Sequence, residues 1–231
     1  VLRKHYEHAI LDIEREAPYK VAGNADHREQ LAEHLMLFYG RGVITVDDSP
    51  DIIDLFFAKA PQSVRYHALE FVGRSLKNED GQVPAEVIER FKKLWERRVH
   101  ALKSFQNPME CSELRAFGWW FICAKFDRAW CVEHLRQALQ LCGWAEPDHL
   151  VVEHLEAIAG ELPSEAVDSL SQLVDGDKNG WGVSSWREHA ATILRTALDS
   201  RVEEARNGAA ALINRLCARG FHDYRSLLDG R

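Results

Sequence analysis

The chain has 231 residues, of which 46% are hydrophobic and 28% are charged, and its formal net charge at pH 7 is −7. This length and apolar share are enough to bury a large core, which excludes a disordered chain. The acidic balance argues against general nucleic-acid binding, because proteins that follow a phosphate backbone usually carry a basic excess.

Helical spacing of apolar residues runs through almost the whole chain, interrupted by prolines and capping residues. In chain order, we expect helices at residues 2–16, 26–40, 49–60, 61–76, 84–104, 108–126, 127–142, 148–159, 163–174, 185–198 and 200–218, and a last turn at 223–228. The only strand-like stretch is Val43–Val46, which is too short to build a sheet. The sequence therefore predicts an all-α protein.

Two of these helices begin with a capping box, an acceptor residue followed three positions later by Glu. The pairs are Asp26 with Glu29 and Ser200 with Glu203. The segment around 117–122 is apolar almost all round, so we expect it to be sandwiched between neighbouring helices.

Two segments share one pattern, with apolar or small residues at relative positions 0, 4, 7 and 8 and an arginine at position 1. They are Val64–Gly73 and Ala205–Asn214. The pattern resembles the second helix of a HEAT repeat; the alternative is any amphipathic helix with a chance arginine. Helix pairs that start at residues 50, 84, 127, 163 and 200 follow one another at steps of 34 to 43 residues. HEAT and armadillo repeats measure about 40–47 residues.

The resemblance implies an all-α fold of stacked antiparallel helix pairs, a HEAT-like α-solenoid or α-α superhelix. We expect residues 1–231 to form a single helical-repeat domain, with 1–45 as an N-terminal helical cap and 50–231 as the repeats. The chain begins without a methionine, so we expect it to be a piece of a larger protein.

The last third has a looser resemblance to the helical tail regions of large bacterial multidomain proteins, including signalling NTPases. It rests on Trp186–Ala191 and Gly220–Tyr224. This resemblance implies a sensor or scaffold segment. It carries over no NTPase activity, because the chain contains no G-x-x-x-x-G-K-[ST] stretch.

One loop has the opening of a calcium-binding EF-hand, with oxygen-bearing side chains at positions 1, 3 and 5. These residues, Asp175, Asp177 and Asn179, are our only metal-ligand candidates. Position 12 is Trp186, where an EF-hand needs a bidentate Glu. We therefore expect a polar turn between helices rather than a metal site.

No catalytic or cofactor-binding residue can be assigned from the sequence. Cys131 and His134 lie three residues apart, a spacing that two zinc ligands on one helix face can have. However, Cys131 continues an apolar stripe with Leu135, Ala138 and Cys142, which predicts core packing. The eleven histidines make no H-E-x-x-H motif, and no nucleophile elbow is present. An enzyme whose site is assembled between helices stays open as an alternative.

Five basic residues crowd the helix predicted at 84–104, which also carries the glutamates Glu86, Glu89 and Glu96. The basic residues are Lys92, Lys93, Arg97, Arg98 and Lys103. This pattern predicts a solvated helix face. The alternative is an anion-binding surface, as in a HEAT-like nucleic-acid module, in which this cluster would converge with Arg65, Arg74 or Arg206.

The five cysteines include no C-x-x-C pair, which predicts free thiols and a cytoplasmic protein. The longest apolar run has nine residues, at 116–124, so we expect no membrane span. Our functional hypothesis is a non-catalytic helical-repeat scaffold or sensor segment. Its partner would be a protein or a neighbouring domain of the same chain, without a cofactor.

Overall fold

The computed structural model of the protein describes residues 7–10, 27–44, 51–104 and 107–229, and these contain no β-strand. The helices up to the middle of the chain are α2 (His27–Gly40), α3 (Ile52–Lys59), α4 (Gln62–Lys77), α5 (Ala85–Leu102), the 3₁₀ helix η1 (Pro108–Ala116) and α6 (Phe117–Ile122). The others are α7 (Arg128–Cys142), α8 (Asp148–Ile158), α9 (Pro163–Gly176), α10 (Trp181–Ser185), α11 (Arg187–Asp199), α12 (Glu203–Ala218), η2 (His222–Arg225) and α13 (Ser226–Asp229). For this part of the chain, the predicted all-α class is confirmed.

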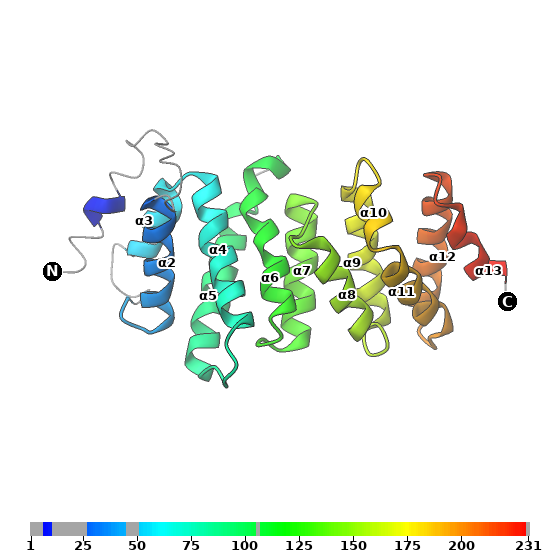
Figure 1. Cartoon of the computed structure of the whole chain (residues 1–231), viewed down its shortest axis with the longest axis horizontal. Helices are drawn as coiled ribbons and strands as arrows, with labels where there is room; N and C mark the ends of the chain where they lie inside the picture. The colour runs from blue at the N-terminus through cyan, green and yellow to red at the C-terminus, as the bar shows by residue number, and fades with distance from the viewer. Residues whose placement is uncertain (1–6, 11–26, 45–50, 105–106, 230–231) are drawn as a thin grey trace.

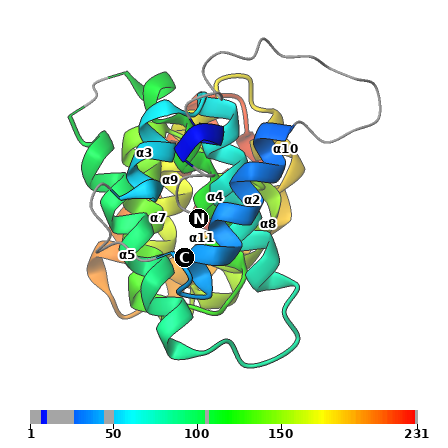
Figure 2. The ribbon, with the colours of Figure 1, turned by 90° about the vertical axis from the view of Figure 1, so that its left-hand side faces the viewer.

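The helices form two rows that follow the longest axis of the molecule (Figures 1 and 2). The first row holds α3, α5, α7, α9 and α12, and the second row holds α2, α4, α6, α8 and α11. In the second row each helix contacts the next; in the first row α7 contacts α5 and α9, and α9 contacts α12. The chain therefore alternates between the rows as it advances.

The centre of the molecule is filled by aromatic rings from both rows. Trp95 of α5 lies 4.5 Å from Phe117 and 5.4 Å from Trp120, measured between ring centroids, and all three side chains are fully buried. The indole nitrogen of Trp120 donates a hydrogen bond to the Leu69 carbonyl at 2.7 Å, so the polar atom of this ring is satisfied. The buried apolar residues form one contiguous core from Ile10 to Tyr224.

Gly73 allows α4 and α6 to cross at close range. A Cβ added to Gly73 would lie 2.6 Å from the Cβ of Trp119 and 2.8 Å from the backbone nitrogen of Trp120. A side chain at this position would therefore push the two helices apart. The second row is tightly packed at this crossing.

The structure differs from the predicted helix at 108–126, which is divided between η1 and the short helix α6. Cys111, Leu114 and Phe117 are all fully buried, and their three-residue spacing matches the period of a 3₁₀ helix. The predicted helix at 185–198 corresponds to α11, whereas the short helix α10 before it was not predicted; the two are separated at Trp186, where φ is −110° and ψ is 26°. The buried Trp186 indole donates to Asp148 Oδ2 at 3.1 Å, which holds the chain in this break.

Several sequence predictions fall wholly or partly outside the described residues. Of the helix predicted at 2–16, only residues 7–10 are described, and these are helical. The capping residue Asp26 also lies outside. In the stretch Val43–Val46, the two described residues, Val43 and Ile44, lie in a bend rather than a strand.

Candidate functional site

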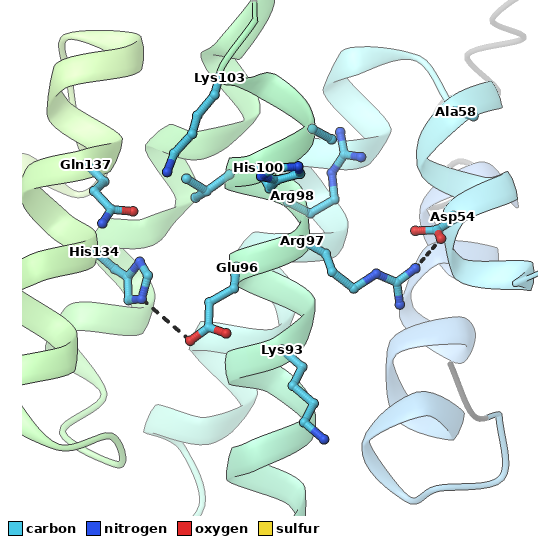
Figure 3. Close-up of a pocket in the computed structure, with 12 residues that line it drawn as sticks. Asp54, Ala58, Lys93, Glu96, Arg97, Arg98, His100, Lys103, His134 and Gln137 are labelled. Atoms are coloured by element: carbon cyan, nitrogen blue, oxygen red, sulfur yellow. Dashed lines mark ion pairs between the residues drawn. The ribbon is translucent and has the colours of Figure 1, made fainter. Parts of the chain in front are cut away.

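A groove with a volume of about 840 Å³ opens along α5, between α3 and α7 (Figure 3). We call it the α5 groove. Its walls include Asp54 and Ala58 from α3 and His134 and Gln137 from α7, and its floor is the outer face of α5.

The amphipathic pattern of α5 explains why charged side chains face this groove. One side of the helix buries its apolar residues Phe91, Leu94, Trp95, Val99 and Leu102 in the core. Side chains three and four positions apart share a helix face. The opposite side therefore presents polar residues at the same spacing, and these are Lys93, Glu96, Arg97, His100 and Lys103.

Arg97 is matched by two carboxylates of α3. Its guanidinium lies 2.6 Å from Asp51 Oδ2 and also contacts Asp54. Burial opposes the charged form, but the hydrogen bonds to Asp51 and Asp54 outweigh it, so the pKa of Arg97 is raised. Asp51 also accepts the Ile53 backbone N–H at 2.9 Å and caps α3. This pair thus joins α5 to the start of α3.

Arg98 is also matched, by a carboxylate that is completely buried. Its Nη2 and Nε atoms donate to Glu113 Oε1 at 2.8 and 3.0 Å, and Arg65 of α4 donates to the other oxygen. Arg98 also lies over the Phe57 ring, 4.5 Å from its centroid. Arg65 and Arg98 therefore do converge, but on an internal carboxylate rather than on an exposed surface.

Lys93, His100 and Lys103 differ from these arginines. All three are exposed in the α5 groove, and no ion pair involves any of them within the described residues. In the described part of the chain, the charges of Lys93 and Lys103 therefore have no ionic partner, although the net charge of the protein is −7. Such unmatched cations are available to an anionic group from outside.

His134 forms the α7 side of the groove and is 8% exposed. Its Nε2 atom lies 3.7 Å from Glu96 Oε1, and its ring lies 4.3 Å from the Trp130 ring. Burial lowers the pKa of His134, against the opposing attraction of Glu96. The side chain therefore favours the neutral form at pH 7.

The chemistry of the α5 groove is that of charge and hydrogen bonding. Among the described residues, its lining consists mainly of lysine, arginine, histidine, carboxylate and amide side chains and includes no serine, threonine, tyrosine or cysteine. The groove therefore has the donors to bind an acidic group.

The metal-ligand candidates of the 175–180 loop have other partners. The carboxylate of Asp177, 5% exposed, accepts the backbone N–H groups of Gly180 and Val183 at 3.0 and 2.8 Å. Asn179 Oδ1 accepts the Trp181 N–H, and Asp175 forms an ion pair with Arg215 at 2.9 Å. No group of three or more His, Cys, Asp or Glu side chains converges anywhere in the described ranges.

The cysteines lie in the core or near it as free thiols. Burial raises the pKa of Cys123 and of Cys142 to about 11 and raises the pKa of Cys131 as well. These thiols stay protonated at neutral pH and therefore lack the thiolate that metal binding and nucleophilic attack require. Cys131 continues the buried stripe of α7, as the sequence predicts.

The basic face of α5 could be predicted from the sequence, but the residues of α3 and α7 that form the walls of the groove could not. Asp54 and Gln137 lie more than 30 residues from the groove lysines, and no local pattern pairs them. The burial of Glu113 was not predicted either, because its neighbours Glu110, Ser112 and Arg115 are polar and nothing in this stretch distinguishes it from an exposed glutamate. The i, i+3, i+4 and i+7 spacing of residues 93, 96, 97 and 100 was the one available signal.

In comparisons with known proteins, no protein-family model matches the chain, and no curated protein or solved structure matches it significantly. None of the helices in the described ranges is both long and apolar enough to cross a membrane.

Proposed function

We propose that this chain is a non-catalytic interaction module, a HEAT-like stack of helix pairs that binds an acidic segment of a partner protein in the α5 groove. The partner is a separate protein or a neighbouring domain of the same chain. One observation carries the proposal: Lys93 and Lys103 are exposed in the groove and have no ionic partner among the described residues, whereas Arg97 and Arg98 form ion pairs.

The order of the helices supports the repeat architecture. The first-row helices α3, α5, α7, α9 and α12 begin at residues 52, 85, 128, 163 and 203, so each step covers 33 to 43 residues. HEAT and armadillo repeats measure about 40–47 residues, and arrays with shorter helices have shorter repeats. Stacked units of this kind expose an extended surface, which such proteins commonly use for binding.

Ion pairs between successive units support the same architecture. Several of them join residues 32 to 36 positions apart, which is close to one repeat. They are Lys92 with Asp127, Arg128 with Glu161, Arg136 with Asp168, and Arg187 with Asp223. Side chains one unit apart therefore meet repeatedly along the stack.

The sequence pattern shared by residues 64–73 and 205–214 supports a pairing of each helix with the helix before it. It does not mean that the two segments occupy the same position in a repeat. Arg65 donates to the carbonyls of Phe57 and Ala60 at the end of α3, and Arg206 donates to the Ser200 carbonyl at the end of α11. Both arginines thus cap the helix before their own. However, α4 lies in the second row and α12 in the first, so the two segments hold different places in the stack.

Binding of an acidic peptide tests this proposal. The probe is a fluorescein-labelled ten-residue peptide with alternating Glu and Leu, and the readout is fluorescence anisotropy. We expect the double variant Lys93→Gln/Lys103→Gln to weaken binding roughly 5–10-fold, with a flatter dependence on salt.

The matched control is Arg195→Gln/Arg201→Gln, which removes the same charge at two exposed arginines outside the groove. We expect it to bind the peptide like the wild type. Equal binding by all three proteins would contradict the proposal. Stronger binding of a fluorescein-labelled DNA oligonucleotide, lost in the lysine variant, would favour the alternative of a nucleic-acid module instead.

A further inference from the structure

Trp181 is the one tryptophan of the seven whose side chain is mainly exposed. The side chain is 79% exposed, whereas the other six are buried or half-buried. Its indole has no hydrogen bond and no ring contact with any described residue. Single exposed apolar residues are common on protein surfaces, so exposure alone assigns no role.

The loop that precedes Trp181, at residues 177–180, is held in place by hydrogen bonds. The buried Asp177 carboxylate accepts two backbone N–H groups of the loop. The Arg219 guanidinium donates to the carbonyls of Val174 and Asp177. Asn179 Oδ1 accepts the N–H of Trp181 itself at 3.1 Å. These bonds hold the backbone of the loop and of Trp181 in place, so a contact made by the indole need not order the loop as well.

An apolar pocket of about 370 Å³ lies between the C-terminal ends of α2 and α4 and the start of α5. We call it the α2–α4 pocket. Its apolar lining includes Leu37, which is 40% exposed, and the half-buried Val87. Its volume is near the lower end of the roughly 300–1,000 Å³ found for small-ligand pockets, which suits one large side chain rather than a helix.

Two charged side chains also line this pocket, in addition to the uncharged Ser75 and Gln82. The Arg41 guanidinium and the Glu79 carboxylate are exposed, and neither has a side-chain partner among the described residues. An indole needs an acceptor for its N–H and is attracted to a cation over its face. Glu79 and Arg41 can supply these two groups.

We propose that Trp181 of one molecule inserts into the α2–α4 pocket of a second copy of this chain. The two surfaces match in size and polarity. They lie at opposite edges of the molecule: the loop before α10 is at the upper edge in Figure 1, and the α4–α5 connection is at the lower edge. Because the two surfaces lie at opposite edges, one pair of molecules cannot make both reciprocal contacts at once, so the contact joins copies head to tail instead of closing as a dimer.

Sedimentation velocity of the intact chain at increasing concentration tests this inference. One side chain makes a small contact, so we expect dissociation constants of roughly 10–500 µM. The mean mass should rise past that of a dimer. Trp181→Ala should weaken association about thirtyfold, as expected for a truncated aromatic hot spot. The control Met109→Ala, at another exposed apolar residue, should associate like the wild type.

A mixing experiment tests the pairing itself. Ser75→Phe places a ring in the pocket from an exposed position of α4 and leaves Trp181 intact. Each variant alone should be monomeric. Their equimolar mixture should form a dimer of one chain of each kind, because the pocket of the Trp181→Ala chain accepts the tryptophan of the other.

Three results would overturn the inference. The first is a wild-type chain that stays monomeric throughout, or that stops at a dimer. The second is unchanged association of Trp181→Ala. The third is a mixture that stays monomeric although both variants are folded by circular dichroism, since Trp181 would then contact some other surface or another protein.

Discussion

The two rows of helices differ in how closely they pack around the middle of the molecule. In the second row, α4 and α6 cross at Gly73 with almost no space between their backbones. In the first row, α3, α5 and α7 diverge toward solvent and leave the α5 groove, with a volume of about 840 Å³. The close-packed row holds the fold together, and the open row offers a surface.

Charges follow the same division. The buried Glu113 carboxylate is shared by Arg65 and Arg98 where both rows meet, and each oxygen accepts from a guanidinium. On the outer face of α5, Lys93 and Lys103 are exposed and form no ion pair with any residue that the structure describes. Buried charges must be matched to be tolerated, whereas exposed ones need no internal partner. The charges that form buried ion pairs therefore stabilise the fold, whereas the exposed charges without an ion pair are available for binding.

The largest effect on stability should come from Glu113→Gln. This change leaves two arginines partly buried without a counter-charge, so we expect the free energy of unfolding to fall by about 3–5 kcal/mol. Urea unfolding followed by circular dichroism measures this loss. The control Glu161→Gln breaks an exposed ion pair with Arg128 and should leave the midpoint unchanged. Similar midpoints for both variants would mean that the buried pair contributes no more than the exposed one.

Gly73→Ala should have the next largest effect. The added methyl must force α4 and α6 apart, which we expect to lower the free energy of unfolding by about 1–3 kcal/mol. Gly160→Ala is the matched control, because a Cβ at that position meets no atom within 4 Å. Urea midpoints compare the two. If Gly73→Ala is as stable as this control, the second row is less tightly packed than its geometry indicates.

Local sequence signals predicted most of the helices but not how they pack together. Asp127 caps α7 through the Trp130 N–H, and α9 begins at Pro163, as their positions in the sequence indicated. The 3₁₀ helix η1 was missed because the three-residue spacing of its buried side chains is easily confused with the 3.6-residue period of an α-helix. The stacking of helix pairs remains a proposal.

The candidate site was less predictable, because its chemistry depends on contacts between distant residues. The sequence shows Arg97 and Arg98 as equivalent neighbours, yet one pairs with α3 and the other with η1. The exposure of Trp181 could not be predicted from the sequence either, because it depends on how the loop before α10 is folded. Which cations are matched, and which apolar residues are exposed, is decided by tertiary structure.

Acidification should have a smaller effect, through His134 on the groove side and His154 in the second row. Burial lowers the pKa of each imidazole below its ordinary 6.5. The unfolded chain therefore takes up protons first, and stability is lost as the pH falls through about 6.5 toward the folded pKa. Glu96, Glu133, Gln137 and Lys103 act on His134, and the two carboxylates and Gln137 only partly offset its burial.

Urea midpoints measured across this pH range in His134→Gln should decline less steeply with acid than those of the wild type. His154→Gln should show the same sign, and the double variant the shallowest decline. An unchanged slope in His134→Gln would show that this imidazole is as free to charge in the groove as in the unfolded chain.

The smallest effect on stability should come from Lys93→Gln/Lys103→Gln. Neither lysine has an ionic partner in the described structure, and glutamine has nearly the same helix propensity as lysine. We expect the free energy of unfolding to stay within about 0.5 kcal/mol of the wild type, although peptide binding is weakened. Thermal unfolding by calorimetry measures this directly. A loss comparable to that of Gly73→Ala would mean that the lysines stabilise the fold, and the distinction between a close-packed row and an open binding row would then fail at α5.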